Sequence, residues 1–187
     1  ERATKMLSTF QDELNDKEIT FLQTLVECGK NEQVSKDTLL RNIIERIWTK
    51  TPNTKVVIFC DETHLADLVY DSLQTEFGES IERHSSKDSL RFVLEDEIKL
   101  LVCDKRGEDG LNLHGGAKLL IHYSVPLSFS RIEQRNGRLN RYSATIHARP
   151  IRSIVLMPNR RSFMASWVEL LDEPIGIFDR SVTGLQY

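Results

Sequence analysis

Four arginines lie close together in the segment 131–141, RIEQRNGRLNR, which contains a single acid, Glu133. If this segment is an α-helix, Gln134, Arg138 and Arg141 fall at positions i, i+4 and i+7 and share one face. Guanidinium groups one turn apart present several N–H donors in fixed planes, which suits phosphate oxygens. The spacing therefore indicates a phosphate site, although a solvated basic helix explains it equally well.

The same segment carries signals for how the helix is held. Ile132 and Leu139 share another face and are expected to anchor the helix to a core. Gly137 is costly inside a helix, so we expect another group to approach the backbone closely there. Ser130 and Glu133 form a capping-box pattern that predicts where the helix begins.

A second polar stretch precedes this helix, with the sequence DKRGEDGLNL over residues 104–113. Its glycines would let the backbone approach a phosphate or a sugar closely. A carboxylate repels phosphate, so Asp104 is a poor partner for a phosphate group, and Lys105 and Arg106 are better ones. Taken alone, the stretch is equally consistent with a solvated turn.

Together, the two stretches resemble motifs V and VI of superfamily-two helicases and translocases. Motif VI has the pattern Q-R-x-G-R-x-x-R, found here at 134–141, and motif V ends in G-[LI]-[ND]-[LF], found at 110–113. The pair looks like the C-terminal RecA-like lobe of a Swi/Snf-type ATPase. Extending the match back to Glu133 makes it most similar to the bacterial RNA-polymerase-associated (RapA/HepA-like) branch. The resemblance covers residues 36–158.

The resemblance implies roles for individual residues at a nucleotide. In this family the two later arginines of motif VI reach across a cleft to the nucleotide phosphates, and here these are Arg138 and Arg141. The same resemblance places Gly110, Asn112 and Gln134 at the bound nucleotide.

The resemblance also implies a nucleic-acid contact. It assigns Lys105 and Arg106 to the nucleic-acid backbone and places His84, at the end of a strand, near it. A histidine in that position is also commonly structural. Swi/Snf-type resemblance favours translocation on double-stranded DNA, with RNA polymerase or other proteins as further partners.

The nucleotide itself must be held elsewhere. No G-x-x-x-x-G-K-[ST] loop occurs in the sequence. The tetrapeptide 61–64, DETH, matches a magnesium-binding pattern, but no phosphate loop precedes it, and we interpret it as the start of a helix. ATP and Mg²⁺ are therefore expected to be held mainly by an N-terminal RecA-like lobe outside this chain, and the isolated chain is expected to be inactive.

Two other classes of protein, a non-hydrolytic binding module and a small-molecule enzyme, are alternatives to a motor lobe. A non-hydrolytic nucleic-acid-binding or scaffold module could retain the helicase fold without the motor. The intact motif VI argues against this, because a dead motor has no need of both arginines. A small-molecule Rossmann enzyme is disfavoured because no G-x-G-x-x-G follows the first strand.

Composition narrows the class of protein further. Residues 131–161 contain eight arginines and one acid, a local balance of +7; because the 187-residue chain carries −3, the remainder carries −10. This asymmetry fits a localised anion site better than a general nucleic-acid coat. The cysteines Cys28, Cys60 and Cys103 have no metal-binding or redox spacing. The sequence contains no apolar run long enough to span a membrane. Together with the cysteine spacing, this predicts a cytoplasmic protein. The start at Glu1 suggests that the chain is a piece of a longer protein.

The pattern of apolar residues predicts an α/β fold. Short apolar runs that do not alternate predict buried parallel strands, and helical spacing fills the segments between them. The order β-α-β-α-β-β-α-β predicts a RecA-like parallel sheet with helices on both faces. The expected strands are 55–60, 80–84, 98–103, 117–125 and 151–157, and the expected helices between and after them include 63–77, 85–95 and 163–171.

The first third of the chain is predicted to be helical. Asn15 and Glu18 form a capping box that starts a helix ending at Gly29, and the polar residues 30–36 are expected to be a linker before a helix over 36–49. We therefore expect a helical extension over 1–35 and a helicase C-terminal RecA-like domain over 36–187.

Overall fold

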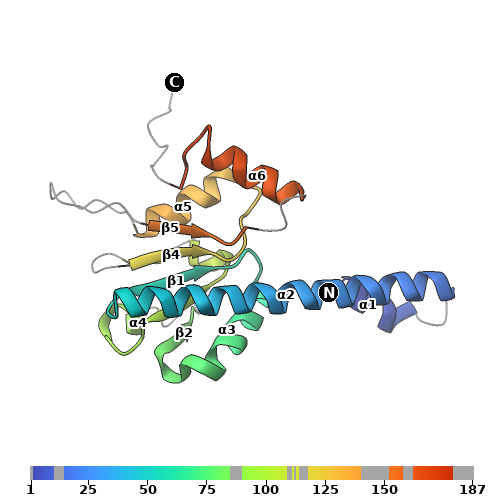
Figure 1. Cartoon of the computed structure of the whole chain (residues 1–187), viewed down its shortest axis with the longest axis horizontal. Helices are drawn as coiled ribbons and strands as arrows, with labels where there is room; N and C mark the ends of the chain where they lie inside the picture. The colour runs from blue at the N-terminus through green and yellow to red at the C-terminus, as the bar shows by residue number, and fades with distance from the viewer. Residues whose placement is uncertain are drawn as a thin grey trace. The chain divides into compact units, whose positions relative to one another are not determined.

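A parallel sheet of five strands occupies the centre of the larger part of the described chain (Figure 1). The computed structural model describes residues 2–10, 15–84, 90–108, 111, 113, 118–139, 152–157 and 162–178. The strands run in the order β2-β3-β1-β4-β5. Their bounds are β1 Lys55–Phe59, β2 Ile81–Arg83, β3 Leu100–Cys103, β4 Lys118–His122 and β5 Arg152–Val155.

Helices connect the strands in the predicted order. The helix α3 spans Thr63–Phe77, as expected, and ends at Gly78, whose φ of 54° favours glycine. The remaining elements are α1 Arg2–Phe10, α2 Asp16–Lys50, η1 Gly78–Ser80, α4 Leu90–Leu94, η2 Lys105–Glu108, α5 Phe129–Leu139 and α6 Phe163–Asp172. The predicted α/β class, parallel sheet and N-terminal helices are confirmed.

Apolar side chains are buried on both faces of the sheet. Val57 lies beside Leu101 of β3 and Leu120 of β4, and the three belong to one apolar cluster. Because side chains alternate along a strand, Val56 and Ile58 point to the other face, and they are fully buried as well. The absence of alternation in the sequence therefore follows from a sheet covered on both sides.

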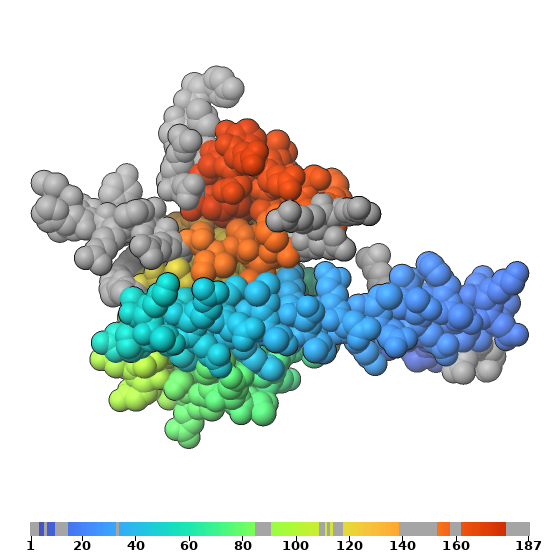
Figure 2. Space-filling model, viewed as in Figure 1, coloured from blue at the N-terminus to red at the C-terminus, as the bar shows by residue number. Residues whose placement is uncertain are grey.

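A second apolar cluster holds α5 and α6 together. Ile132 of α5 is fully buried and packs with Val168 and Leu171 of α6, so the anchoring role predicted for Ile132 is confirmed. The side chain of Leu139 lies outside those described. Figure 2 shows α6 in orange to red at the surface, and Phe163 on this helix is exposed.

The helix predicted from Asn15 to Gly29 begins where expected but does not end there. Asn15 Oδ1 accepts hydrogen bonds from the backbone of Glu18, and Glu18 Oε2 accepts one from the backbone of Asn15, each at 3.0 Å, which forms the predicted capping box. The helix does not stop at Gly29, and no linker occurs over 30–36, because α2 continues to Lys50. One glycine costs about 1 kcal/mol, and the lysine, glutamate and glutamine that follow it are good helix formers.

The chain divides into two compact units, residues 1–42 and 43–187. This division falls inside α2, whereas the sequence suggested a boundary between residues 35 and 36. The part of α2 in the second unit is tied to it through Trp48, whose indole Nε1 donates to the Thr54 carbonyl at 3.0 Å and whose ring meets Phe77 edge-on. None of the described helices is long and apolar enough to cross a membrane.

The predicted cap of the arginine helix is also wrong. The helix α5 begins at Phe129, so Ser130 lies inside it and Ser128 directly precedes it. The hydroxyls of these two serines lie 3.0 Å apart. The backbone N–H of Ile132 donates to the Ser128 carbonyl at 3.4 Å, so the helix starts two residues before the position that the capping-box pattern predicted.

Candidate functional site

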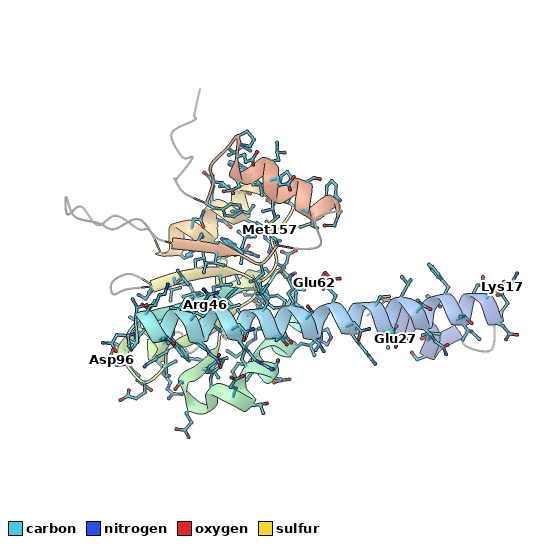
Figure 3. All side chains as sticks on the ribbon, in the orientation of Figure 1. Lys17, Glu27, Arg46, Glu62, Asp96 and Met157 are labelled. Atoms are coloured by element: carbon cyan, nitrogen blue, oxygen red, sulfur yellow. The ribbon has the colours of Figure 1, made fainter. Side chains whose placement is uncertain are left out.

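The residues directly after the strands lie at one end of the sheet, because the carboxyl ends of parallel strands point the same way. Asp61 follows β1 and Asp104 follows β3. In Figure 3, Glu62 and Met157, which follow β1 and β5, lie near one end of the strands, and Asp96, which precedes β3, lies near the other end. The two stretches singled out in the sequence are therefore positioned at a common edge.

Glu108, the last residue of η2, joins the two stretches. Its carboxylate accepts hydrogen bonds from Arg131 Nε at 2.6 Å and Nη2 at 2.9 Å. It also accepts one from Arg135 Nε at 2.7 Å. Both arginines belong to α5, so one carboxylate fixes this helix to the end of η2.

Arg135 is an interior residue, although it lies in the middle of an arginine-rich segment. Its side chain has an exposure of 0%, and its Nη1 donates to the Ser124 carbonyl at 2.7 Å. Its guanidinium lies 5.2 Å from the centre of the Phe59 ring. Burial lowers the pKa of Arg135 and the Glu108 carboxylate opposes this, but an arginine remains charged in either case.

Asp61 belongs to the same ionic cluster. Its Oδ1 lies 2.6 Å from Arg131 Nη1 and 3.7 Å from Arg135 Nη2, so both guanidiniums lie between two carboxylates. The helix α3 does begin at Thr63, as the reading of DETH as a helix start predicted. The carboxylate of Asp61, however, faces α5.

Arg138 differs from the two preceding arginines. Its Nε donates to the backbone carbonyl of Glu108 at 2.6 Å, and its side chain is half-buried. Within the described residues, no carboxylate is paired with Arg138 and its two terminal nitrogens make no hydrogen bond. Gln134, predicted to share its face, is exposed. The predicted site residues Arg141, Gly110 and Asn112 lie outside the described residues.

Gly137 does not have the close neighbour expected for it. An added Cβ would meet no described atom within 4 Å. The close approach instead occurs at Gly107, where an added Cβ would lie 2.9 Å from Cys103 Cβ and 2.9 Å from a methyl group of Leu111. The turn of η2 therefore packs directly on the end of β3, which sets the position of Glu108.

Substitution of Gly107 by alanine is expected to lower the free energy of unfolding by about 1–3 kcal/mol, because the new methyl group overlaps two buried side chains. Gly29→Ala in α2 is the matched control: its Cβ meets nothing within 4 Å, so this change should not destabilise the chain. Urea unfolding of both variants measures the difference, and equal midpoints would contradict the close packing of η2.

Asp104 has an internal role. It is fully buried, and its carboxylate accepts hydrogen bonds from Arg83 Nη2 at 2.9 Å and Arg106 Nη2 at 2.7 Å. It also accepts from the backbone N–H of Arg106 at 2.8 Å. Burial by itself raises the pKa of this carboxyl, but the hydrogen bonds from Arg106 and Arg83 outweigh it and hold the pKa well below its usual range.

The three residues predicted to contact nucleic acid differ in accessibility. Lys105 is exposed. Arg106 is also exposed, but Asp104 holds its guanidinium in one orientation. His84 is buried at 5% exposure, and its Nδ1 has no hydrogen-bond partner among the described residues. Burial is the main cause that lowers the pKa of His84. Their role in binding stays a prediction.

Acid should weaken the fold through Asp104. Because its folded pKa is depressed, its charge stabilises the fold above the unfolded pKa of about 3.9, and this stabilisation is lost as the pH falls towards the folded pKa. We expect Asp104→Asn to be less stable than wild type at pH 7 and to lose less stability between about pH 5 and 3. Urea unfolding at several pH values measures this, with the exposed Asp96→Asn as control. Parallel pH profiles for wild type and Asp104→Asn would contradict it.

Part of this site was not anticipated from the sequence. The pairing of Glu108 with Arg131 and Arg135, and the contribution of Asp61, depend on contacts between residues far apart in the chain. A local signal did exist, because Glu108 is an acid in a loop beside a strongly basic helix. Nothing local distinguished it from Asp109, the next acid in the same loop.

Solved structures with this fold include several helicase and ATPase domains. The Pyrococcus furiosus Hef helicase domain has a TM-score of 0.62 and 21% identity, covering 89% of this chain and 35% of that one. The C-terminal part of the Fun30 ATPase domain has a TM-score of 0.58 and 14% identity, covering 90% and 63%. The Mss116p DEAD-box helicase domain 2, solved bound to an RNA duplex, has a TM-score of 0.52 and 21% identity, covering 66% and 50%. These likenesses show the fold.

Sequence comparison adds a relative and a family. The Defense against restriction protein B of Escherichia phage P1 is 36% identical over 58 residues. That match covers 28% of this chain and only 3% of the phage protein. The family model described as the helicase conserved C-terminal domain matches residues 35–143, more than half of the chain. This match shows that the chain belongs to the helicase conserved C-terminal domain family.

Proposed function

We propose that this chain is the second motor lobe of an ATP-dependent DNA translocase or helicase, in which Arg138 and Arg141 contact ATP held between this lobe and an N-terminal RecA-like lobe. The observation that carries the proposal is the difference among the arginines of α5. Arg131 and Arg135 are paired with the carboxylates of Glu108 and Asp61. Among the residues that the structure describes, Arg138 instead donates only to a backbone carbonyl. Its terminal nitrogens can therefore donate to a phosphate from outside the chain.

Such a donor would act on the transferred phosphoryl group. Negative charge spreads over the phosphoryl oxygens in the transition state, and a guanidinium held in position stabilises it without having to reorganise. ATP and Mg²⁺ would be held mainly by the N-terminal lobe. On this side, Gly110, Asn112 and Gln134 are proposed to contact the nucleotide.

Nucleic acid is proposed to bind at the end of β3. Lys105 is exposed there, and Arg106 is held by a buried carboxylate with part of its guanidinium in solvent. Two cations at one turn suit a few phosphates, so binding should be steeply salt-dependent. We propose double-stranded DNA as the substrate. The motif pattern that starts at Glu133 supports a place in the RapA/HepA-like branch, and we therefore propose RNA polymerase as a partner.

The proposal predicts that ATP turnover requires both lobes. We expect the isolated 187-residue chain to show no turnover, because no phosphate-binding loop occurs in it. The full-length protein that contains both lobes should hydrolyse ATP, and double-stranded DNA should stimulate it more than RNA does. Turnover is measured with and without each nucleic acid. A full-length protein that binds DNA without any turnover would contradict the motor and favour the non-hydrolytic alternative.

A further inference from the structure

Three arginines of α5 converge on one residue of η2. Arg131 and Arg135 donate to the two carboxylate oxygens of Glu108, and Arg138 donates to its backbone carbonyl. These arginines lie four and three residues apart, so the contacts extend along two turns of the helix. A rotation of α5 about its axis, or a shift along it, would break at least one of these bonds.

The position of Glu108 is itself fixed by its surroundings. The residue is 2% exposed, and the glycine before it allows η2 to lie against Cys103. A buried carboxylate is costly unless it is paired and hydrogen-bonded. Here the guanidiniums of Arg131 and Arg135 supply that pairing. The same bonds therefore fix Glu108 in place and fix α5 to η2.

We propose that Glu108 is a positioning residue for Arg138, an inference that rests on the proposed function of Arg138 as the residue that contacts ATP. The carboxylate fixes the end of η2 against α5, and this brings the Glu108 carbonyl to Arg138 Nε. The bond at 2.6 Å then sets the plane of the Arg138 guanidinium and directs its terminal nitrogens. Glu108 acts through Arg138 and needs no contact with the nucleotide.

The substitution Glu108→Gln separates the carboxylate from the carbonyl. Glutamine keeps the volume and the backbone carbonyl, but it offers one oxygen acceptor where two guanidiniums require two, and its amide donors would face other donors. If Glu108 only fills space, Arg138 should be unaffected, because its acceptor is still present. If the carboxylate positions the turn, Arg138 should lose its fixed geometry.

Nuclear magnetic resonance of the ¹⁵N-labelled 187-residue chain can observe this directly. The Nε–Hε group of an ordered arginine gives its own signal, and Arg138→Lys identifies the one that belongs to Arg138. We expect this signal to exchange slowly with water in the wild type and to shift and exchange faster in Glu108→Gln. The matched control is Glu95→Gln, which removes an exposed carboxylate paired with Arg91 and should leave the Arg138 signal unchanged.

Turnover in the full-length protein is the second readout. Misplacing a catalytic group by about 1 Å can lower the rate about 10²-fold, so Glu108→Gln should lower kcat by that order while KM for ATP changes less. A folded Glu108→Gln variant with the wild-type Arg138 signal overturns the proposal. If that variant does not fold, Arg131→Gln, which removes one guanidinium from the same carboxylate, is measured in its place with the same criterion. The two proposals can also fail separately. If Glu108→Gln changes the Arg138 signal but Arg138→Ala leaves turnover unchanged, then Glu108 positions Arg138, and the proposed contact of Arg138 with ATP is wrong.

Discussion

Replacing Arg138 by alanine is expected to lower ATP turnover of the full-length protein by about 10³–10⁵-fold, or about 4–7 kcal/mol of transition-state stabilisation. The reason is that its terminal nitrogens are the donors proposed for the phosphoryl oxygens. The cost to folding should be much smaller. Within the described part of the chain, Arg138 makes one hydrogen bond, from Nε to the Glu108 carbonyl, and such a bond contributes about 0.5–3 kcal/mol.

Two further variants separate catalysis from folding. Arg138→Lys keeps the charge but lacks the planar fork that grips two oxygens, so it should restore little turnover. Arg91→Ala removes an arginine from an exposed pair on another helix and should change neither turnover nor melting. The measurement is turnover beside thermal melting for all three. Near-normal turnover in Arg138→Ala, or a loss that merely follows melting at the assay temperature, would refute the proposed role.

Much of the fold could be predicted because it depends on local patterns. The strands are short apolar runs, and their burial on both faces removes the alternation that a half-exposed strand would show. The bounds of α3 follow from helical spacing that ends at Gly78. The capping box of Asn15 and Glu18 formed as expected, because both of its partners lie within one turn.

The incorrect predictions concern competition between signals. Gly29 can end a helix or be tolerated within one, and the choice depends on the helix formers that follow it rather than on the glycine. Ser130 matched a capping box, but Ser128 lies closer to the point where the chain turns into α5. In each case two local signals competed, and the sequence alone did not rank them.

The site was predictable in its location and less so in its internal contacts. The motifs identified α5 and the loop after β3, and the parallel sheet brings both to one edge. The sequence does not show which arginine is buried, because Arg135 is paired with Glu108, which lies 27 residues away in the chain. The structure shows that Arg135 forms a buried salt bridge with Glu108, which its place in a basic segment does not reveal.

Replacing Arg135 by alanine is expected to lower the free energy of unfolding by about 3–5 kcal/mol, the cost of breaking a buried ion pair by removing one partner. Arg135 has no exposed area, and Glu108, its partner, would keep a buried charge with Arg131 alone. The Ser124 carbonyl would also lose its donor. Urea unfolding measures the change, with Arg91→Ala as the exposed control, for which we expect less than about 1 kcal/mol.

A double-mutant cycle tells the ion pair from simple packing. Arg135→Met keeps most of the apolar stem, so its cost reports mainly the charge left on Glu108. Adding Glu108→Gln removes that charge, and the double variant should then be more stable than the sum of the single changes predicts, by about 0.5–3 kcal/mol. Arg131 can turn to Asp61, which already lies 2.6 Å from its Nη1, so the double variant leaves no guanidinium without a carboxylate. Strictly additive changes would show that Arg135 stabilises α5 by its volume alone, and that the buried pair with Glu108 adds nothing to the fold.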